Sequence, residues 1–169
     1  MNNCYECGTK LTQKIDNEGQ LIQYCDNCKQ FRYPIFNTAI STAVVNKSKD
    51  KVILIKQYGK DDYILVAGYV TKGESAEQTV VREVKEELRL DVVDFEYMRS
   101  EYFAGSNTLM LNFISIVDDE DLSHIAEDEV DKATWFTFDE ARKNIKKGSL
   151  AEKFLLKILD KLEQEKVSV

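Results

Sequence analysis

The 169-residue chain contains one proline, one tryptophan and one histidine, and it has no uninterrupted run of about 18 apolar residues. By hydropathy, the lack of such a run excludes a helix that spans a bilayer. The first ten residues, MNNCYECGTK, also lack the basic start and apolar stretch of a signal peptide. We therefore expect a cytoplasmic protein. The single histidine, His124, stands in a polar segment, where we expect it to face solvent rather than to act in catalysis.

The composition, with 43% hydrophobic and 31% charged residues, is that of a globular protein with one core and room for a small appendage. The formal net charge of -7 argues against binding of nucleic acid through many phosphate contacts, because such binding needs clustered Lys and Arg. An acidic protein that acts on phosphates requires cations between its own carboxylates and the substrate. Divalent metal ions have that role in many enzymes.

All four cysteines lie within the first 28 residues, as Cys4 with Cys7 and Cys25 with Cys28, in two C-x2-C pairs. Two such knuckles joined by a hairpin form a tetrahedral Cys4 site, and residues 10–12 and 21–24 are typical of its strands. The alternative is two disulfides, which the expected reducing compartment disfavours. We predict a structural Zn2+ ion that stabilises a zinc ribbon of about 30 residues, too few for a core of their own.

The remaining chain has the pattern of one α/β domain. Three capping boxes predict helix starts at Ser75, Thr137 and Ser149. In the first helix, Val80, Val81, Val84 and Leu88 fall on one arc that would face a sheet. The last helix has one apolar stripe, formed by Phe154, Leu155, Ile158, Leu159 and Leu162. Segments rich in β-branched and apolar residues predict strands at 36–46, 52–57, 63–67, 92–103, 108–117 and 132–138. The implied architecture is a mixed sheet with helices on both faces.

Three glutamates cluster on the first predicted helix. Glu83, Glu86 and Glu87 are spaced i, i+3 and i+4, so their side chains emerge on one face and repel one another. Converging carboxylates are what Mg2+ or Mn2+ requires. The alternative is a solvated face balanced by Arg82, Lys85 and Arg89, and the helix by itself does not decide between the two.

The surrounding residues do favour the metal site. The stretch 68–90 resembles the Nudix box, G-x5-E-x7-R-E-U-x-E-E-x-G-U with U apolar, at every position except the late Gly, which is Arg89 here. The resemblance implies the Nudix α/β/α sandwich over residues 34–169, behind the zinc ribbon at 1–33. At Arg89 a glycine would adopt the left-handed conformation that ends a helix. We expect a slightly different helix exit at this position and an intact active site.

The resemblance also implies roles for individual residues. Glu83, Glu86 and Glu87 are the implied Mg2+ or Mn2+ ligands, with the Gly68 carbonyl as a further one. Arg82 would orient the glutamates, and Glu74 would support the structure. An additional metal-binding glutamate stands six residues before a Trp-Phe pair in such proteins, a role that falls to Glu129 before Trp135. The neighbouring Glu127 and Asp128 are alternatives for the same role, and a solvated acidic loop is the alternative for all three.

A zinc ribbon directly ahead of a Nudix domain resembles the NADH pyrophosphatase branch, as do Tyr33-Pro34 and the segments 67–70 and 109–113. In that branch an aromatic just after the first Gly of the box stacks on a base, which implies this role for Tyr69. The alternative is a half-buried strand residue. The branch motif S-Q-P-W-P-F-P-x-S is missing from residues 99–108. Tyr102 and Phe103 occupy that stretch and are candidate substrate contacts.

The expected reaction is metal-dependent hydrolysis of a pyrophosphate linkage in a nucleoside-diphosphate compound, with a dinucleotide such as NAD(H), giving AMP and a mononucleotide, as the favoured substrate. Glu83, Glu87 and Glu129 are all candidates for the general base. The missing motif supports an alternative, an ADP-ribose or sugar-nucleotide pyrophosphatase. A further alternative is a non-catalytic nucleotide sensor with a zinc ribbon. The family resemblance also leads us to expect a homodimer.

Overall fold

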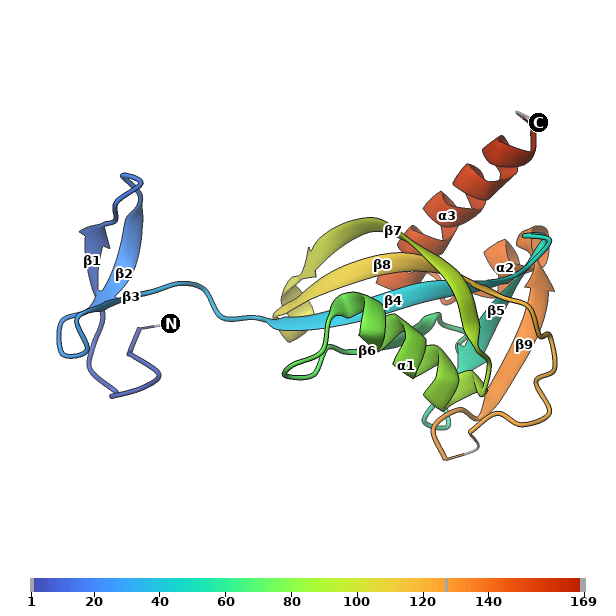
Figure 1. Ribbon diagram of the computed structural model, residues 1–169, viewed down its shortest axis with the longest axis horizontal. Helices are drawn as coiled ribbons and strands as arrows, with labels where there is room; N and C mark the ends of the chain where they lie inside the picture. The colour runs from blue at the N-terminus through green and yellow to red at the C-terminus, as the bar shows by residue number, and fades with distance from the viewer. Residues whose placement is uncertain (1, 127, 168–169) are drawn as a thin grey trace. The chain divides into compact units, whose positions relative to one another are not determined.

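The computed structural model describes residues 2–126 and 128–167 and divides the chain into two compact units, Met1–Phe36 and Asn37–Val169. The division falls three residues after the boundary expected from the sequence. Among the described residues, no helix is long and apolar enough to cross a membrane. Figure 1 shows the elements of each unit.

The unit Met1–Phe36 is a three-stranded antiparallel sheet in the order β1-β2-β3. Its strands are β1 (Thr12–Ile15), β2 (Leu21–Cys25) and β3 (Gln30–Arg32). The predicted hairpin is present, with β1 starting two residues later than expected. The sequence did not predict β3, because three residues are too few to show a strand pattern; it pairs with β2 just after the second cysteine pair.

A mixed sheet forms the centre of the unit Asn37–Val169. Its order is β7-β8-β4-β5-β9, with β6 also paired to β4. The β4–β8 pair is parallel and every other pair is antiparallel. The strands are β4 (Asn37–Asn46), β5 (Lys51–Lys56), β6 (Val66–Tyr69), β7 (Val92–Phe103), β8 (Thr108–Val117) and β9 (Lys132–Thr137), and a short 3-10 turn, η1 (Ala104–Ser106), joins β7 to β8.

Helices cover both faces of this sheet, as α1 in green and α2 and α3 in orange and red show in Figure 1. The helices are α1 (Ala76–Leu88), α2 (Phe138–Asn144) and α3 (Leu150–Val167). Side chains alternate across the central strands: Val45 and Leu54 pack with α2 and α3, whereas Val44 and Ile53 pack with α1. The five predicted stripe residues of α3 are all buried. The expected α/β/α sandwich is therefore confirmed.

The start of α1 agrees with the prediction from its capping box. Ser75 accepts from the Gln78 amide, and the Gln78 side chain accepts from the Ser75 amide. Thr137 and Glu140 form the same arrangement at α2. At α3 the third predicted box is only half formed, because the Glu152 carboxylate accepts from the Gly148 amide instead of the Ser149 amide. This carboxylate still satisfies an amide beside the start of the helix.

Three predictions from the sequence were wrong in detail. Val81 is 41% exposed, since it lies about 100° around the helix from Val80 and misses the sheet. The strand expected at 63–67 is β6, which starts only at Val66 and runs on through Gly68 to Tyr69 because those residues pair with β4, while Tyr63 and Ile64 form isolated bridges. The helix exit is not altered at Arg89: this residue itself adopts the left-handed conformation, with φ 60°, and its amide donates to the Lys85 carbonyl.

We predict that Arg89→Gly stabilises the fold by about 1 kcal/mol, because glycine adopts the left-handed conformation without steric cost. The free energy of unfolding in urea is the measurement. Arg89→Ala, which removes the same side chain and keeps the Cβ atom, is the matched control and should unfold close to wild type. A glycine variant no more stable than the alanine variant would contradict the prediction.

Candidate functional site

The α1 helix places its glutamates in different environments. Glu83 and Glu87 are buried on the side that faces the sheet, with 8% and 3% exposure, while Glu86 is half-buried. Burying two carboxylates one helical turn apart is unfavourable unless other groups offset their charge. The residues around them show how this protein does so.

Arg82 holds three of the acidic side chains. Its guanidinium donates to Glu74 at 2.8 and 3.0 Å, to Glu83 at 2.7 Å and to Glu86 at 2.8 Å. It also donates to the Tyr69 carbonyl at 3.1 Å. Five fixed N–H donors allow one arginine to make this set of charge-assisted bonds. Arg82 thereby ties the helix to the loop that follows β6.

Gly68 and Glu83 are in such close contact that a larger residue at position 68 would displace the Glu83 carboxylate from its present position. A Cβ atom built there would lie 1.8 Å from a carboxylate oxygen of Glu83. The Gly68 φ angle is not in the left-handed region, so the requirement is for space rather than for backbone freedom. The carboxylate of α1 and the backbone of β6 therefore meet directly.

Glu87 has a buried carboxylate that is only partly satisfied by hydrogen bonds. Gln57 donates to its Oε1 at 2.7 Å, while its Oε2 is buried and has no hydrogen-bond partner among the described residues. Burial, together with the neighbouring Glu83 and Glu129, raises the pKa of Glu87 to about 8. A buried carboxylate oxygen without a donor is chemically suited to a hard metal ion.

A cleft of about 390 Å3 opens between β6, α1 and the loop before β9. Among the described residues, its lining brings together five of those predicted from the sequence: Gly68, Tyr69, Glu83, Glu87 and Glu129. No individual role was predicted for the other lining residues, which are Ala39, Tyr58, Ala67, Thr108 and Met110. Of these, only Tyr58 stands in a sequence pattern that could have indicated its position, because a Tyr-Gly pair between two predicted strands indicates a turn.

Other candidates lie outside this cleft. Glu86 lines a separate groove with Val81 and Phe95. Tyr102 and Phe103 are exposed at the end of β7 and are not among the residues that line the cleft, although Phe103 pairs with Thr108 of β8, which does line it. Glu127 lies outside the described residues.

The carboxylates of the cleft do not converge closely enough to coordinate one ion in the present arrangement. Among the described residues, the four cysteines form the only group of three or more His, Cys, Asp or Glu side chains whose ligand atoms all lie within 4.8 Å of one another. Arg82 holds Glu83 and Glu86, and Gln57 holds Glu87. The donor set of the cleft nevertheless fits Mg2+ or Mn2+, since it consists of carboxylate and backbone carbonyl oxygen atoms, the ligands that hard divalent ions prefer.

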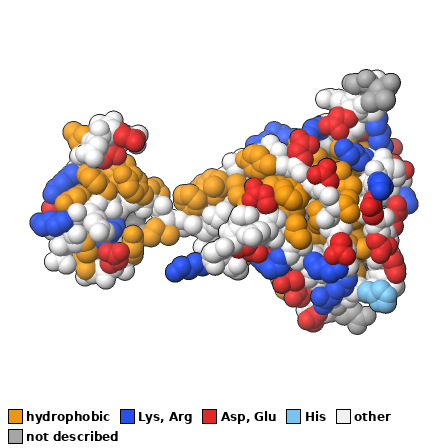
Figure 2. Space-filling view, in the orientation of Figure 1, with side chains coloured by type: hydrophobic (Ala, Val, Ile, Leu, Met, Phe, Trp, Pro, Cys, Tyr) orange, Lys and Arg blue, Asp and Glu red, His pale blue; other side chains and the backbone are white. Residues whose placement is uncertain are grey.

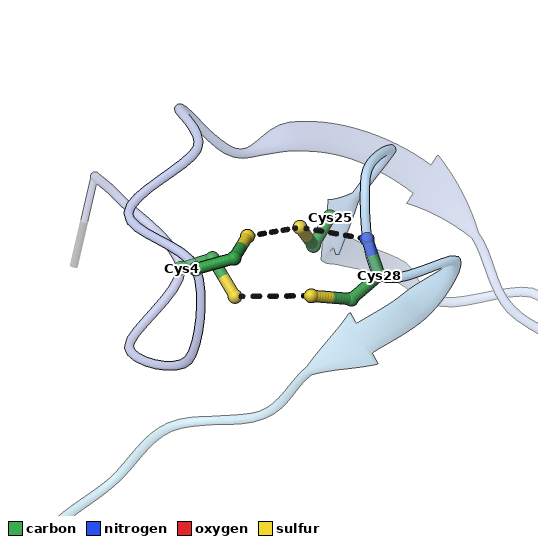
Figure 3. Close-up of side chains that lie close together, drawn as sticks. Cys4, Cys25 and Cys28 are labelled. Carbon is green, nitrogen blue, oxygen red and sulfur yellow. Dashed lines mark hydrogen bonds between the residues drawn. The ribbon is translucent and has the colours of Figure 1, made fainter.

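The cysteines form a separate cluster in the unit Met1–Phe36. The Sγ atoms of Cys4 and Cys28 lie 3.9 Å apart and those of Cys7 and Cys25 lie 3.5 Å apart. Figure 3 shows that the thiols of Cys4, Cys25 and Cys28 point toward one another. All four are free, which contradicts the disulfide alternative. In a tetrahedral site with Zn–S bonds of about 2.3 Å, the sulfurs lie roughly 3.8 Å apart. The cluster could therefore hold zinc.

The charges near this cluster are largely paired. Lys14 lies 2.7 Å from Asp26, and the buried Arg32 donates to Cys4 Sγ at 3.2 Å and to Glu6 at 2.5 Å. On the face of Asn37–Val169 in Figure 2, Lys and Arg side chains are interspersed with Asp and Glu. His124 is exposed, as expected. These observations agree with the net charge of -7.

The comparison with protein families defines the class. The NUDIX domain model matches residues 36–157, so the chain belongs to the NUDIX domain family. Among solved structures, a NUDIX hydrolase from Nitrosomonas europaea has a TM-score of 0.63 at 18% identity, covering 97% of this chain and 93% of that chain. A NUDIX-family hydrolase from Clostridium perfringens has a TM-score of 0.60 at 15% identity, covering 78% of this chain and 99% of that chain. At these identities the likeness is one of fold.

Curated relatives include proteins named NAD-capped RNA hydrolase NudC. The one from Pseudomonas aeruginosa is 34% identical over 139 residues, which cover 80% of this chain and 48% of the relative. The one from Vibrio cholerae is 29% identical over 167 residues, covering 96% of this chain and 59% of the relative. The chain thus spans about half the length of these relatives. The resemblance to the NADH pyrophosphatase-like branch is confirmed.

The Arg82–Glu74 contact leads to a pH prediction. Hydrogen bonds from Arg82 lower the pKa of Glu74 from its ordinary 4.5 to about 2. Because the folded-state pKa is the lower one, the contact stabilises the fold fully above about pH 4.5, and this stabilisation is lost as the pH falls toward 2. We expect Glu74→Gln to lower the urea midpoint at pH 7, and we expect its difference from wild type to shrink between pH 4.5 and 2.

Glu77→Gln is the control for this experiment, because it removes an exposed carboxylate from the first turn of the same helix. Its difference from wild type should be small throughout. If the Glu74→Gln difference stayed constant across the acidic range, the contact with Arg82 would not be the cause of the loss of stability.

Proposed function

We propose that this protein is a metal-dependent pyrophosphohydrolase that cleaves the P–O–P linkage of a nucleoside-diphosphate compound. The observation that carries the proposal is the cleft in which Glu83, Glu87 and Glu129 converge beside the Gly68 backbone. Buried carboxylates with an unpartnered oxygen are costly to maintain, and such costs are concentrated at functional sites. Membership of the NUDIX domain family supports this proposal.

Glu83, Glu87 and Glu129 would hold Mg2+ or Mn2+ in the cleft, with the Gly68 carbonyl as a further oxygen ligand. When bound, the metal would supply positive charge to the phosphate oxygens and activate a water molecule. Arg82 would keep Glu83 oriented, and Gln57 would keep Glu87 oriented, through the hydrogen bonds described above. A carboxylate of Glu83, Glu87 or Glu129 would accept the proton of the attacking water. Glu86 would join this set by moving from its contact with Arg82.

We propose a dinucleotide of the NAD(H) type as substrate, cleaved to AMP and a mononucleotide. The relatives' printed names and the position of Tyr69 in the cleft support this choice. The net charge of -7 favours a small molecule over an RNA bound through its phosphates. The second candidate, an ADP-ribose or sugar-nucleotide pyrophosphatase, is favoured by the missing S-Q-P-W-P-F-P-x-S motif at 99–108. A nucleotide sensor without catalysis is the third.

A product assay with Mg2+ or Mn2+ tests these candidates. We expect turnover of NAD+ or NADH to exceed that of ADP-ribose, nucleoside triphosphates and NAD-capped RNA. Glu87→Gln should lower kcat about 100-fold or more. An uncharged amide binds a divalent ion less well than a carboxylate does, so the ion would no longer stabilise the charge of the transition state. The variant should stay folded, since the Gln57 donor retains an acceptor at position 87. Glu77→Gln, outside the cleft, should keep wild-type turnover.

Faster cleavage of ADP-ribose than of NAD+ and NADH would favour the second candidate. If wild type turned over none of these compounds while still binding them, the hydrolase proposal would be wrong and the sensor would become the better account.

We also propose that the cysteine cluster binds one structural Zn2+ ion, and we expect one zinc per chain by elemental analysis of protein kept under reducing conditions. Cys28→Ser should lower this content, because a site that loses a thiolate loses affinity. Removing zinc with a chelator should make residues 2–36 sensitive to proteolysis while leaving 37–167 resistant. Only the first unit depends on zinc for its fold, since the second has an apolar core of its own. Reduced protein without zinc would contradict this assignment.

A cytoplasmic location and a homodimer complete the proposal. Four free thiols are best preserved in a reducing compartment. Val81 and Phe95 form an apolar surface next to the edge strand β7, which is suited to contact with a second copy. Sedimentation equilibrium should give a mass twice the 19.5 kDa of the chain, and a mass of one chain at all concentrations would overturn the dimer.

A further inference from the structure

Tyr58 lies in a turn that is unfavourable for tyrosine. The turn spans Gln57 to Lys60, and the Lys60 amide donates to the Gln57 carbonyl at 3.2 Å. Its two central residues, Tyr58 and Gly59, both have positive φ angles, of 58° and 67°. This is the type I′ arrangement, for which Asn-Gly is the favoured pair. A bulky residue with a Cβ atom is disfavoured at the first central position.

Nothing in the fold requires the Tyr58 side chain. It is 80% exposed. In the part of the chain that the structure describes, no hydrogen bond or ring contact of this side chain is present. The turn therefore bears an unfavourable conformation without gaining any packing from the aromatic ring. Strained residues of this kind are concentrated at functional sites.

The turn is held firmly at both ends. On one side of Tyr58, the Gln57 side chain donates to Glu87 at 2.7 Å. On the other side, the Gly59 amide donates to the Asp131 carboxylate at 2.7 Å, and the Asp131 amide donates to the Lys56 carbonyl at 2.9 Å. These bonds tie the turn both to α1 and to the segment that follows Glu129. The backbone that carries Tyr58 is thus fixed relative to the carboxylates.

Tyr58 lines the same cleft as Tyr69, Glu83, Glu87 and Glu129. The two tyrosines come from separate segments, the β5–β6 connection and the end of β6, and both are largely exposed. The small side chains of Ala39 and Ala67 also line the cleft and leave it room. Exposed aromatic faces beside a phosphate-processing site are suited to stack on a planar heteroaromatic ring.

We propose that Tyr58 is a substrate-binding residue that stacks on a planar ring of the nucleotide substrate, so that Tyr58 and Tyr69 together select ring-bearing phosphate compounds. The proposal rests on the proposed function, because it takes the carboxylate cleft as the place where the phosphates bind. It explains why tyrosine stands where asparagine would suit the turn better. Binding at Tyr58 is gained at the expense of stability in the free protein.

The test uses Tyr58→Asn, which should change stability and binding in opposite directions. We expect the urea midpoint to rise, because asparagine tolerates the left-handed conformation. We expect KM for NAD+ with Mg2+ to rise about 10-fold or more, the loss typical of one removed stacking contact, with a smaller change in kcat. Tyr58→Phe, which keeps the ring, should recover a KM close to wild type and leave the midpoint low.

Lys49→Asn is the matched control. Lys49 also has a positive φ angle, of 53°, in the turn between β4 and β5, where its amide donates to the Asn46 carbonyl, and it does not line the cleft. This variant should raise the midpoint and leave KM unchanged. A Tyr58→Asn variant with wild-type KM would overturn the proposal.

Direct binding of AMP, measured by calorimetry, separates this proposal from the proposed function. If wild type failed to cleave NAD+ but bound AMP, and Tyr58→Asn weakened that binding, the hydrolase assignment would fall and the role of Tyr58 would stand. If wild type cleaved NAD+ and Tyr58→Asn bound AMP as tightly as Lys49→Asn did, the role of Tyr58 would fall and hydrolysis would stand.

Discussion

The charge-assisted hydrogen bonds of Arg82 are the interaction on which the cleft depends. Carboxylates one helical turn apart repel one another, and the two that face the sheet are also removed from water. One guanidinium contacts Glu74, Glu83 and Glu86 and reaches the Tyr69 carbonyl. Helix α1, strand β6 and the loop between them are thereby held in one arrangement. Without this cation, Glu83 and Glu86 would lose the donor that offsets their charge.

Arg82 donates to Glu83 and Glu86 but not to Glu87, and the proposed chemistry would use the carboxylate oxygen of Glu87 that lacks a donor among the described residues. Glu87 receives one hydrogen bond from Gln57 and has a buried oxygen with no donor among the described residues. Glu83 lies directly against the Gly68 backbone. In the free protein these features reduce stability. A bound divalent ion would make these oxygen atoms its ligands and turn an unfavourable arrangement into a favourable one. The affinity for the metal would then depend on how firmly the fold keeps other hydrogen-bond donors away from the carboxylates.

The backbone at Tyr58 also lowers the stability of the free protein at a place where we propose that it serves binding. Its left-handed conformation lowers stability, while hydrogen bonds at Gln57 and Gly59 hold the turn in place. The turn, the unpartnered carboxylate oxygen and the Gly68 contact are all found around one cleft. Three unfavourable features of this unit therefore lie where we propose that substrate binds, while others, such as the left-handed Lys49 and Arg89, lie outside the cleft. The core on either side of the sheet, by contrast, is packed with apolar side chains in regular alternation.

The sequence by itself determined the features that depend on neighbouring residues. Capping boxes marked the starts of α1 and α2, periodicity gave the bounds of β7 and β8, and spaced cysteines and glutamates indicated two separate sites. Only the tertiary structure decided which distant residues share the cleft. Tyr58 and Glu129 stand far from Glu83 in the chain and reach it because β5, β6 and the segment before β9 are joined through sheet pairing. Tyr102 and Phe103 were expected to contact the substrate and are not among the residues that line the cleft, although Phe103 pairs with Thr108, which does line it. Local patterns do not encode the strand order that brings β7 beside β8.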